Sequence, residues 1–378
     1  MVLPENNNCD LFQYNPIKKR QPKCLSSGDT VHIRIGIGTE YLIFLDRGKQ
    51  MTNPSEALLE QIKMSWQLGS QLRFIRKVEN WIYKDEEKQL FIRITEPSHR
   101  SESQLKSELN WMFFLQKQGV KFAHPVPSLR NRLVEEFSDD KDKWYASVFR
   151  EARGIPLYKK EDFTAKRLNI WGRLIGQLHS ATLDYQKPAH IEPRCQWNSE
   201  RAFLYNQEVF SPDHSLYSQY QRLINWLSQH PKTKHNYGLI HADIHQGNFL
   251  VDESDEFTLF DFDDCHYHWF AYDLATPLFG LSMSMRESCS REEIEEMHRC
   301  LFAGYRETGV LREEELELIP HFILYRHFSI YTFAWKNLEN HTLSERTKDW
   351  MHMALAFCRS FIESYDTDTL VFREKLRD

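Results

Sequence analysis

The spacing of hydrophobic and polar positions in the first half of the chain predicts a small β-sheet and one long helix. Strand-like runs occupy residues 74–75, 80–83, 89–95 and 144–149. A charged turn at 84–88 separates two of these runs, which is the signal of a β-hairpin. Between Ser101 and Gln118, apolar residues recur every three or four positions, as on the core-facing side of a helix. A break at Gly154-Ile155-Pro156 ends this first unit.

The second half is predicted to be mainly helical. Helical periodicity runs through 165–182 and returns at about 200–229, 291–308, 320–337 and 347–364. Two short strand-like runs, 249–251 and 257–260, flank the acidic turn 252–256 and predict a small hairpin. Most of the chain therefore divides into a β-rich unit at 56–152 and a helical unit at 153–378.

Residues 1–55 share neither pattern and are interpreted as an N-terminal extension of unknown role. An alternation at 32–37 is typical of a strand, and the spacing from Asn53 to Glu56 is typical of a helix start. Two explanations stay open. Either the residues before Met51 are an accessory extension, or the start codon has been assigned too early.

Composition and charge are those of an ordinary globular protein. The 378 residues are 41% hydrophobic and 27% charged, and 48 basic against 54 acidic side chains give a formal charge of −6. Because the two signs are interspersed, the charge gives no reason to expect a nucleic-acid partner. The seven cysteines are scattered without C-x-x-C spacing, which predicts neither a disulfide framework nor a zinc site. No segment has the pattern of a signal peptide or a membrane span, so we expect a cytoplasmic protein without a membrane partner. The oligomeric state is left open.

Candidate chemistry is concentrated in residues 239–263. His241, Asp243 and Asn248 form an H-x-D motif with an asparagine five positions after the aspartate, the spacing of a kinase catalytic loop. The predicted hairpin returns Asp261 beside Asn248. Mg²⁺ prefers carboxylate and amide oxygens, and phosphoryl transfer needs an aspartate that orients the acceptor hydroxyl. An isolated H-x-D is more often a turn capped by its aspartate, whereas the complete set favours phosphoryl transfer.

Three segments resemble the aminoglycoside phosphotransferase and choline kinase superfamily. They are H-A-D-I-H-Q-G-N-F-L-V-D at 241–252, F-D-F-D-D at 260–264 and Y-D-L-A at 272–275. The likeness extends more weakly over about 70–360. It implies an α+β, two-lobed protein-kinase-like fold. A small antiparallel N-lobe sheet with one major helix would bind nucleotide, and a larger, mainly helical C-lobe would carry catalysis. The resemblance also implies ATP and Mg²⁺ as cofactors and a small molecule with a hydroxyl as acceptor.

The resemblance assigns roles to individual residues of the C-lobe. Asp243 matches the catalytic aspartate, and Asn248 and Asp261 match the metal ligands. Asp273 matches an aspartate that braces the catalytic loop from the following helix. Two loop histidines match residues that hold the backbone shape; they are His241 and His245.

In the N-lobe, Arg93 matches the position from which such kinases place a cation over the ATP phosphates. Glu108 matches its partner on the next helix. Relatives carry lysine more often at this position, but the fork of donors on an arginine keeps the phosphate contact. Taken alone, the two residues are more simply a surface arginine and a solvated glutamate. The adenine is expected to bind backbone groups of the segment from Phe149 through Glu151 to Ala152.

The nucleotide loop departs from the family pattern, because no glycine lies between residues 72 and 93. Glycine normally eases the approach of backbone to phosphate. The resemblance in this loop rests on Glu79 and Asn80, and Lys77 is hypothesised to supply positive charge at its tip.

The acceptor side allows two interpretations. Aromatic residues along 322–335 are most simply core, and the alternative is that Tyr331 or Trp335 borders a pocket for an amine-bearing alcohol, helped by cation–π attraction. Residues 266–270 are a second candidate wall. Asp263 and Asp264 either reach metal or substrate, or cap the next turn, and capping is favoured.

Three functions remain in competition. The prediction is a kinase for a small-molecule hydroxyl, on an amino alcohol, a hydroxy amino acid or a sugar-like acceptor. A protein serine/threonine kinase of the stress-response type is the first alternative, and an open acceptor cleft would mark it. A nucleotide-binding pseudokinase scaffold is the second. It is supported only by the loop without glycine and is opposed by the intact Asp243, Asn248 and Asp261.

Overall fold

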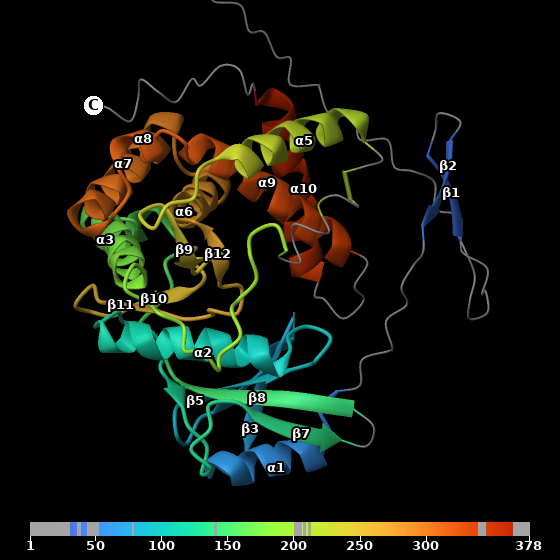
Figure 1. Ribbon diagram of the computed structural model, residues 1–378, viewed down its shortest axis with the longest axis vertical. Coiled ribbons are helices and arrows are strands. Elements are labelled where there is room, and N and C mark those ends of the chain that lie inside the picture. Colours follow the sequence, from blue (N-terminus) through green and yellow to red (C-terminus); the bar gives the residue numbers. More distant parts are fainter. Residues whose placement is uncertain are drawn as a thin grey trace, which may run out of the picture. The chain divides into compact units, whose positions relative to one another are not determined.

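The chain forms two compact units, residues 1–53 and 54–378. The computed structural model describes residues 31–35, 39–43, 53–77, 79–139, 142–199, 206, 209–210, 213–338 and 345–365. In the first unit, β1 (Val31–Ile35) and β2 (Thr39–Ile43) form an antiparallel hairpin. The second unit has a β-rich N-lobe and a mainly helical C-lobe (Figure 1), which confirms the predicted fold class.

A six-stranded antiparallel sheet forms the N-lobe. The strands lie in the order β3-β4-β5-β8-β6, and β7 also pairs with β8. They are β3 (Leu72–Lys77), β4 (Trp81–Asp85), β5 (Leu90–Thr95), β6 (Pro125–Val126), β7 (Glu135–Asp139) and β8 (Asp142–Arg150). Asp85 pairs with Leu90 across the charged turn, so the predicted hairpin is confirmed.

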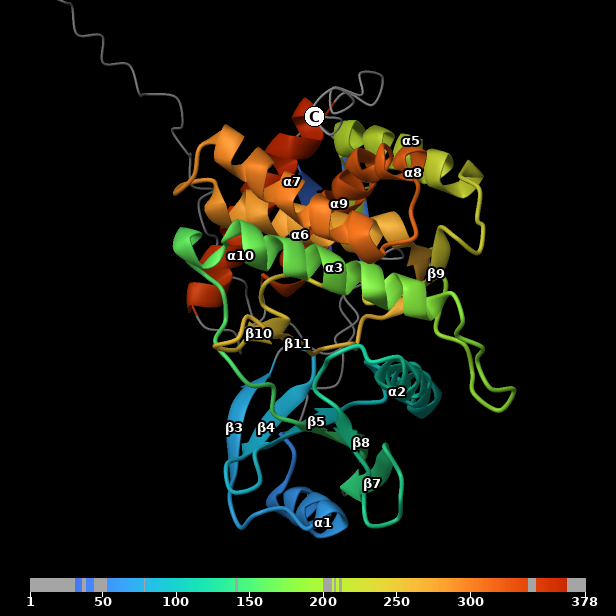
Figure 2. The ribbon, with the colours of Figure 1, turned by 90° about the vertical axis from the view of Figure 1, so that its left-hand side faces the viewer.

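Two helices cover the sheet, one on each side (Figures 1 and 2). Helix α1 (Glu56–Trp66) begins at Ser55, whose side chain accepts from the backbone of Leu58, and buries its apolar side in the core of the sheet. Helix α2 (Glu102–Lys117) lies between the sheet and the C-lobe. Trp111 of α2 packs against Phe262 of the C-lobe, with ring centroids 5.7 Å apart. The buried side of helix α2 therefore belongs to the large hydrophobic core that contains the C-lobe helices.

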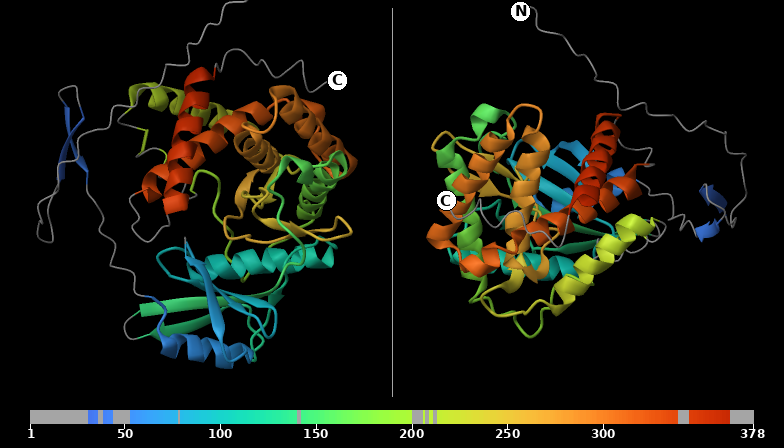
Figure 3. Two further views of the ribbon diagram at one scale, coloured as in Figure 1. Left: turned by 180° about the vertical axis from the view of Figure 1, so that it is seen from behind. Right: turned by 90° about the horizontal axis from the view of Figure 1, so that it is seen from above.

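The C-lobe combines helices with two short strand pairs. The helices are α3 (Ala165–Thr182), α5 (His214–Gln229), α6 (Phe270–Met285), α7 (Arg291–Thr308), α8 (Glu313–Leu316), α9 (Ile319–Asn337) and α10 (Glu345–Ser364), and a 3₁₀ turn spans Lys160–Asp162. The strand pairs are β9 (Tyr237–Ile240) with β12 (His266–Trp269) and β10 (Phe249–Val251) with β11 (Phe257–Leu259). Helix α10 lies along α9 (Figure 3). None of the described helices has both the length and the apolarity needed to cross a bilayer.

A close crossing of α3 and α7 places one polar side chain in the centre of the C-lobe. A Cβ atom on Gly172 would lie 1.8 Å from the carbonyl oxygen of Leu301, and one on Gly304 would lie 1.8 Å from that of Asn169. Only glycine permits this approach of the two backbones. His179 of α3 then reaches the hydroxyl of Tyr305 on α7, 3.0 Å away.

Candidate active site

The loop between β9 and β10, residues 241–248, is held from below by Asp273 of α6. The carboxylate of Asp273 accepts from the backbone N–H groups of His241, at 2.9 Å, and Ala242, at 2.6 Å. His179 lies 3.3 Å from the same carboxylate. Ala242 has φ +67°, in the left-handed region that non-glycine residues rarely adopt. Asp273 thus supports a strained loop, with the geometry expected of the predicted brace.

The two loop histidines form hydrogen bonds within this segment. The Nδ1 atom of His241 accepts from the backbone N–H of Asp243, and its Nε2 lies 3.2 Å from the carbonyl oxygen of Phe260. The Nδ1 atom of His245 accepts from the backbone N–H of Gly247, which leaves Nε2 to donate to Asp243, 3.4 Å away. Both rings therefore stabilise the backbone shape, and a further role for either is untested.

Asp243 has partners for both carboxylate oxygens. Oδ2 accepts from Nδ2 of Asn248 at 2.9 Å and faces His245. Oδ1 accepts from the guanidinium of Arg326 on α9. Burial raises the pKa of Asp243, but His245 and Arg326 outweigh it and hold the pKa below its usual range. An ionised, oriented carboxylate results, well suited to accept a hydrogen bond and poorly suited to remove an alcohol proton early.

The β10–β11 hairpin returns Asp261 to the end of this loop. The backbone N–H of Phe260 donates to the carbonyl oxygen of Asn248 at 3.0 Å, so the next residue, Asp261, stands beside Asn248. Asp261 has φ +65°. Burial raises the pKa of this carboxyl, assisted by the negative charges of Asp263 and Asp243 and opposed by Arg76. The guanidinium of Arg76 lies 3.1 Å from Asp261 Oδ2.

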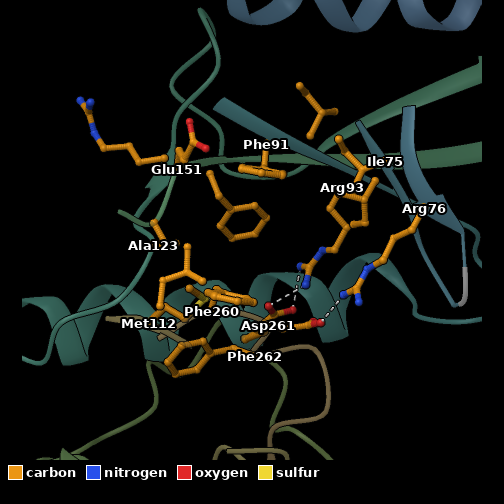
Figure 4. A pocket seen from close by; sticks show the side chains of 17 residues that line it. Ile75, Arg76, Phe91, Arg93, Met112, Ala123, Glu151, Phe260, Asp261 and Phe262 are labelled. Carbon is orange, nitrogen blue, oxygen red and sulfur yellow. Dashed lines mark hydrogen bonds and ion pairs between the residues drawn. The ribbon is translucent and has the colours of Figure 1, made fainter. Parts of the chain in front are cut away.

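A cavity of about 330 Å³ lies between the lobes above Asp261 (Figure 4). Its walls are mostly apolar and come from both lobes; they include Ile75, Ile82, Phe91, Met112, Phe149, Leu250, Phe260 and Phe262. Arg93 and Glu108 form its buried charged side, with two hydrogen bonds of 2.9 Å between guanidinium and carboxylate. The guanidinium also lies 5.1 Å from the centre of the Phe149 ring. The structure therefore pairs the two N-lobe residues that the sequence singled out.

Phe149, Glu151 and Ala152 line the same cavity where β8 leaves the N-lobe sheet. The backbone N–H of Glu151 donates to the carbonyl oxygen of Gln89, and its side chain pairs with Lys84 at 2.9 Å. The segment expected to bind adenine is thus at the cavity wall, and its contact with a base stays a prediction.

In the nucleotide loop, Arg76 lines the cavity, whereas the hypothesis gave the positive charge to Lys77. Arg76 lines the cavity and faces Asp261, whereas the Lys77 ammonium lies over the ring of Trp81, 5.7 Å from its centre. Neighbouring residues on a strand point to opposite faces, which explains the difference. Asn80 is buried; it donates to Asp263 and accepts from the hydroxyl of Thr95.

Asp263 and Asp264 bind the N-lobe rather than the following turn. Asp263 Oδ2 lies 2.6 Å from His99, and Asp264 Oδ1 accepts from Arg100 at 2.7 Å. Burial raises the pKa of Asp263, but Arg100, His99 and Arg93 outweigh it and lower the pKa well below its usual value. These contacts join the lobes and differ from the turn-capping role that the sequence favoured. Neither His99 nor Arg100 was predicted from the sequence.

The candidate acceptor residues lie away from this cavity. Tyr331 packs against Phe210, with ring centroids 5.2 Å apart, and Trp335 is 47% exposed at the surface. Neither is among the residues that line the cavity. In the second candidate wall, residues 266–270, four of the five side chains are buried in the core. An acceptor contact for any of them stays untested.

Arg326 was missed because it is distant in sequence from the loop it contacts. It is nonetheless the one residue of the four charged types (Asp, Glu, Lys, Arg) between Ile319 and Trp335, and a lone charge in an apolar helix was an available signal. Arg76 was missed because the neighbouring Lys77 carries the same positive charge and was taken as the candidate.

Comparisons with known proteins show the family of this chain. A model of the phosphotransferase enzyme family matches residues 72–307, from β3 to the end of α7. The chain belongs to the phosphotransferase enzyme family. This phosphotransferase is therefore an enzyme, and its predicted likeness to the aminoglycoside phosphotransferases is confirmed.

Several similar proteins are named as kinases of small molecules. Amicoumacin kinase of Bacillus subtilis (strain 168) is 29% identical over 286 residues, which cover 74% of this chain and 84% of the relative. The structure of amicoumacin kinase hAmiN in complex with AMP-PNP, Ca²⁺ and Ami is similar with a TM-score of 0.73 and 27% identity, covering 82% of this chain and 93% of that one. A microcompartment-associated aminopropanol kinase shares the fold, with a TM-score of 0.63 and 22% identity over 82% of this chain and 98% of that one.

Proposed function

We propose that this phosphotransferase moves the γ-phosphoryl group of ATP to a hydroxyl of a small molecule, with the help of Mg²⁺. The observation that carries the proposal is the grouping of Asp243, Asn248 and Asp261 at one end of the inter-lobe cavity. Phosphoryl transfer needs little covalent help from the protein and depends on positioning and on charge stabilisation, which these residues are arranged to provide.

The cavity has the properties of a nucleotide site. Its apolar walls suit an adenine base, and the segment Phe149–Ala152 adds backbone groups at one edge. Arg93 lines the cavity and is held by Glu108, and each of its two Nη groups keeps a second N–H that would be available to a phosphate oxygen. A fork of N–H groups binds phosphate oxygens well, so arginine is a competent replacement for the usual lysine.

A divalent cation fits the residues between cavity and loop. Asn248 uses its amide nitrogen to contact Asp243 and so leaves its oxygen for a cation, and Asp261 offers a carboxylate. Both are hard oxygen ligands of the kind that Mg²⁺ takes. The guanidinium of Arg76 already places positive charge against Asp261. Bound there, the metal would neutralise charge on the phosphate oxygens.

Asp243 acts mainly by orientation. Because its pKa is held low by His245 and Arg326, it accepts a hydrogen bond from the acceptor hydroxyl and aligns the oxygen for attack. Proton transfer follows late, when the oxygen has begun to bond to phosphorus and has become acidic.

The relatives support a small-molecule acceptor over the two alternatives. The similar chains are named as kinases of amicoumacin and aminopropanol, so amino alcohols and related hydroxyl compounds come first. No contact in the described residues favours a protein substrate. Family membership and the intact site speak against a pseudokinase scaffold.

The test is a phosphate-transfer screen with matched variants. Wild type, Asp243→Asn and Asp255→Asn are assayed with ATP, Mg²⁺ and a panel of amino alcohols, hydroxy amino acids, aminoglycosides and generic proteins. Asp255 is the control, because it lies in the β10–β11 turn and pairs with Arg167 and Lys166 instead of the loop. We expect at least one small-molecule acceptor, and a fall in kcat of about 100-fold or more in Asp243→Asn alone.

Three results would change the proposal. Transfer that persists in Asp243→Asn removes the assigned role of this residue. Phosphorylation confined to proteins supports the protein-kinase alternative, and the absence of any ATP turnover by the wild type supports the scaffold.

A further inference from the structure

We propose that Arg326 of α9 is a positioning residue for phosphoryl transfer and that it acts through Asp243. The inference rests on the proposed function, because it takes Asp243 as the residue that orients the acceptor hydroxyl. Arg326 stands outside every motif that the sequence analysis used, and only the packing of α9 against α6 and the loop brings it to the site.

The guanidinium of Arg326 is held at three points. One Nη donates to Oδ1 of Asp243, and the other lies 3.4 Å from the carbonyl oxygen of Ala242 and 3.5 Å from the hydroxyl of Tyr272. Tyr272 precedes Asp273, which holds the backbone of the same loop. Tyr272 and Asp273 of α6 therefore support the loop in two ways. Asp273 binds the backbone of the loop, and Tyr272 contacts the arginine that binds Asp243.

The contacts of Asp243 divide between its two oxygens in a way that fixes the plane of the carboxylate. Arg326 occupies one side of Oδ1, and Asn248 and His245 occupy Oδ2. Each carboxylate oxygen has two acceptor sites, so Oδ1 keeps one for an acceptor hydroxyl. Without Arg326, only the contacts at Oδ2 would oppose rotation of the group about its Cβ–Cγ bond.

The charge of Arg326 has a second consequence. Asp243 and Asp261 bring two carboxyl groups to this place, and a triphosphate would add negative charge beside them. A buried cation beside Asp243 offsets this repulsion and allows a carboxylate to stand next to the transferring group. Because the guanidinium is in place before the reaction begins, no group has to rearrange to supply its positive charge.

A purely structural ion pair explains the geometry less well. Buried ion pairs contribute little to stability, and apolar residues of the same volume often serve better. Arg326 is 9% exposed, and its Nε–H has no acceptor among the described residues. A buried donor left without a partner is unfavourable, so stability alone gives no reason for an arginine here.

The test compares Arg326→Ala, Arg326→Lys and Asp243→Asn with the double variant Arg326→Ala/Asp243→Asn. Arg167→Ala is the matched control, since Arg167 on α3 of the same lobe makes an arginine–aspartate pair of 2.7 Å with Asp255. ATP turnover is measured with the acceptor found in the panel and with water, and melting temperatures are recorded for all variants.

We expect kcat to fall about 100-fold in Arg326→Ala while KM for ATP stays within about threefold, because the loss concerns the alignment of the acceptor. Guanidinium at millimolar concentration should restore part of the activity of Arg326→Ala and leave Arg167→Ala unchanged. In the Asp243→Asn background, Arg326→Ala should cause no further loss, since the two residues act as one unit.

Two results overturn the inference: a folded Arg326→Ala with kcat within about threefold of the wild type, or losses that multiply in the double variant. If Arg326→Ala does not fold, the Arg326→Lys variant decides, because it keeps the positive charge and loses the fork of donors. An unchanged kcat in Arg326→Lys then contradicts the proposal.

A wild type without turnover on any acceptor or water refutes the proposed function instead. In that case the melting temperatures test whether Arg326 and Asp243 interact. If the shifts of the two single variants simply add up in the double variant, the two residues do not interact.

Discussion

At the residue scale, the loop that carries Asp243 depends on a few buried side chains beneath it. Ala242 adopts an unfavourable backbone angle, and its N–H is held by Asp273 together with that of His241. Strain of this kind persists only where neighbouring groups compensate for it. The position of Asp243 is thus a property of its surroundings as much as of its own side chain.

Asp273→Asn should loosen this loop. The amide presents one oxygen and one N–H₂ group where the carboxylate accepts twice, so one backbone N–H loses its acceptor. We expect the free energy of unfolding to fall by about 1–3 kcal/mol. Turnover should fall while KM for ATP changes little. Urea unfolding and steady-state kinetics measure both, and an Asp273→Asn protein with the stability and kcat of the wild type would contradict the role of brace.

At the element scale, the alternation of side chains along a strand decides which of two neighbouring cations lines the cavity. Arg76 and Lys77 are neighbours on β3, and only Arg76 lines the cavity beside Asp261. Desolvation lowers the pKa of Lys77, partly offset by Glu96 and Glu79, and its ammonium lies over Trp81. In a loop without glycine, we expect the Arg76 side chain to supply the phosphate contacts that backbone N–H groups make in glycine-rich loops.

Arg76→Ala should raise KM for ATP about tenfold or more, since a charge-assisted hydrogen bond to phosphate is lost. Without nucleotide, the same variant should bind Mn²⁺ more tightly, because Asp261 no longer has a competing cation. Calorimetry with Mn²⁺ alone measures this second effect. Lys77→Ala tests the earlier hypothesis in parallel: an unchanged KM for ATP in Lys77→Ala rejects it, and an unchanged KM in Arg76→Ala rejects the present one.

At the scale of the whole molecule, the lobes meet through side chains at the end of β11. Asp261 and Asp263 of the C-lobe bind Arg76, Asn80 and His99 of the N-lobe. Within the C-lobe, helix packing buries His298 of α7 and His321 of α9. Burial lowers the pKa of His298 to about 4 and, together with the charge of His230, lowers that of His321 to about 4.

These histidines make stability depend on pH. The ordinary pKa is about 6.5, so between pH 6.5 and 4 the unfolded chain binds more protons and the free energy of unfolding falls as pH falls. For His298 the loss from pH 7 to pH 5 is about 2 kcal/mol. Urea unfolding at both pH values should show His298→Gln with a smaller loss than the wild type. The exposed His235 is the control, and an equal loss in His298→Gln and His235→Gln would exclude the effect.

Much of the fold was predictable because its elements have one buried side. Helix α7 spans Arg291–Thr308, as its periodicity indicated, and the β10–β11 hairpin lies where the two short runs predicted it. Helix α6 was not singled out by periodicity, because 13 of its 16 residues are buried and no polar stripe marks a surface. A helix enclosed on all sides has no amphipathic pattern to detect.

The sequence by itself determined the chemistry of the loop, since the order and spacing of Asp243, Asn248 and Asp261 are local and a short hairpin is enough to bring them together. Only the tertiary structure decided what surrounds that chemistry. Arg326 reaches Asp243 because α9 crosses α6 beneath the loop, and Arg76 reaches Asp261 because the two lobes close on one cavity. Contacts between distant segments depend on how whole helices and lobes pack, and residue spacing carries no record of that geometry.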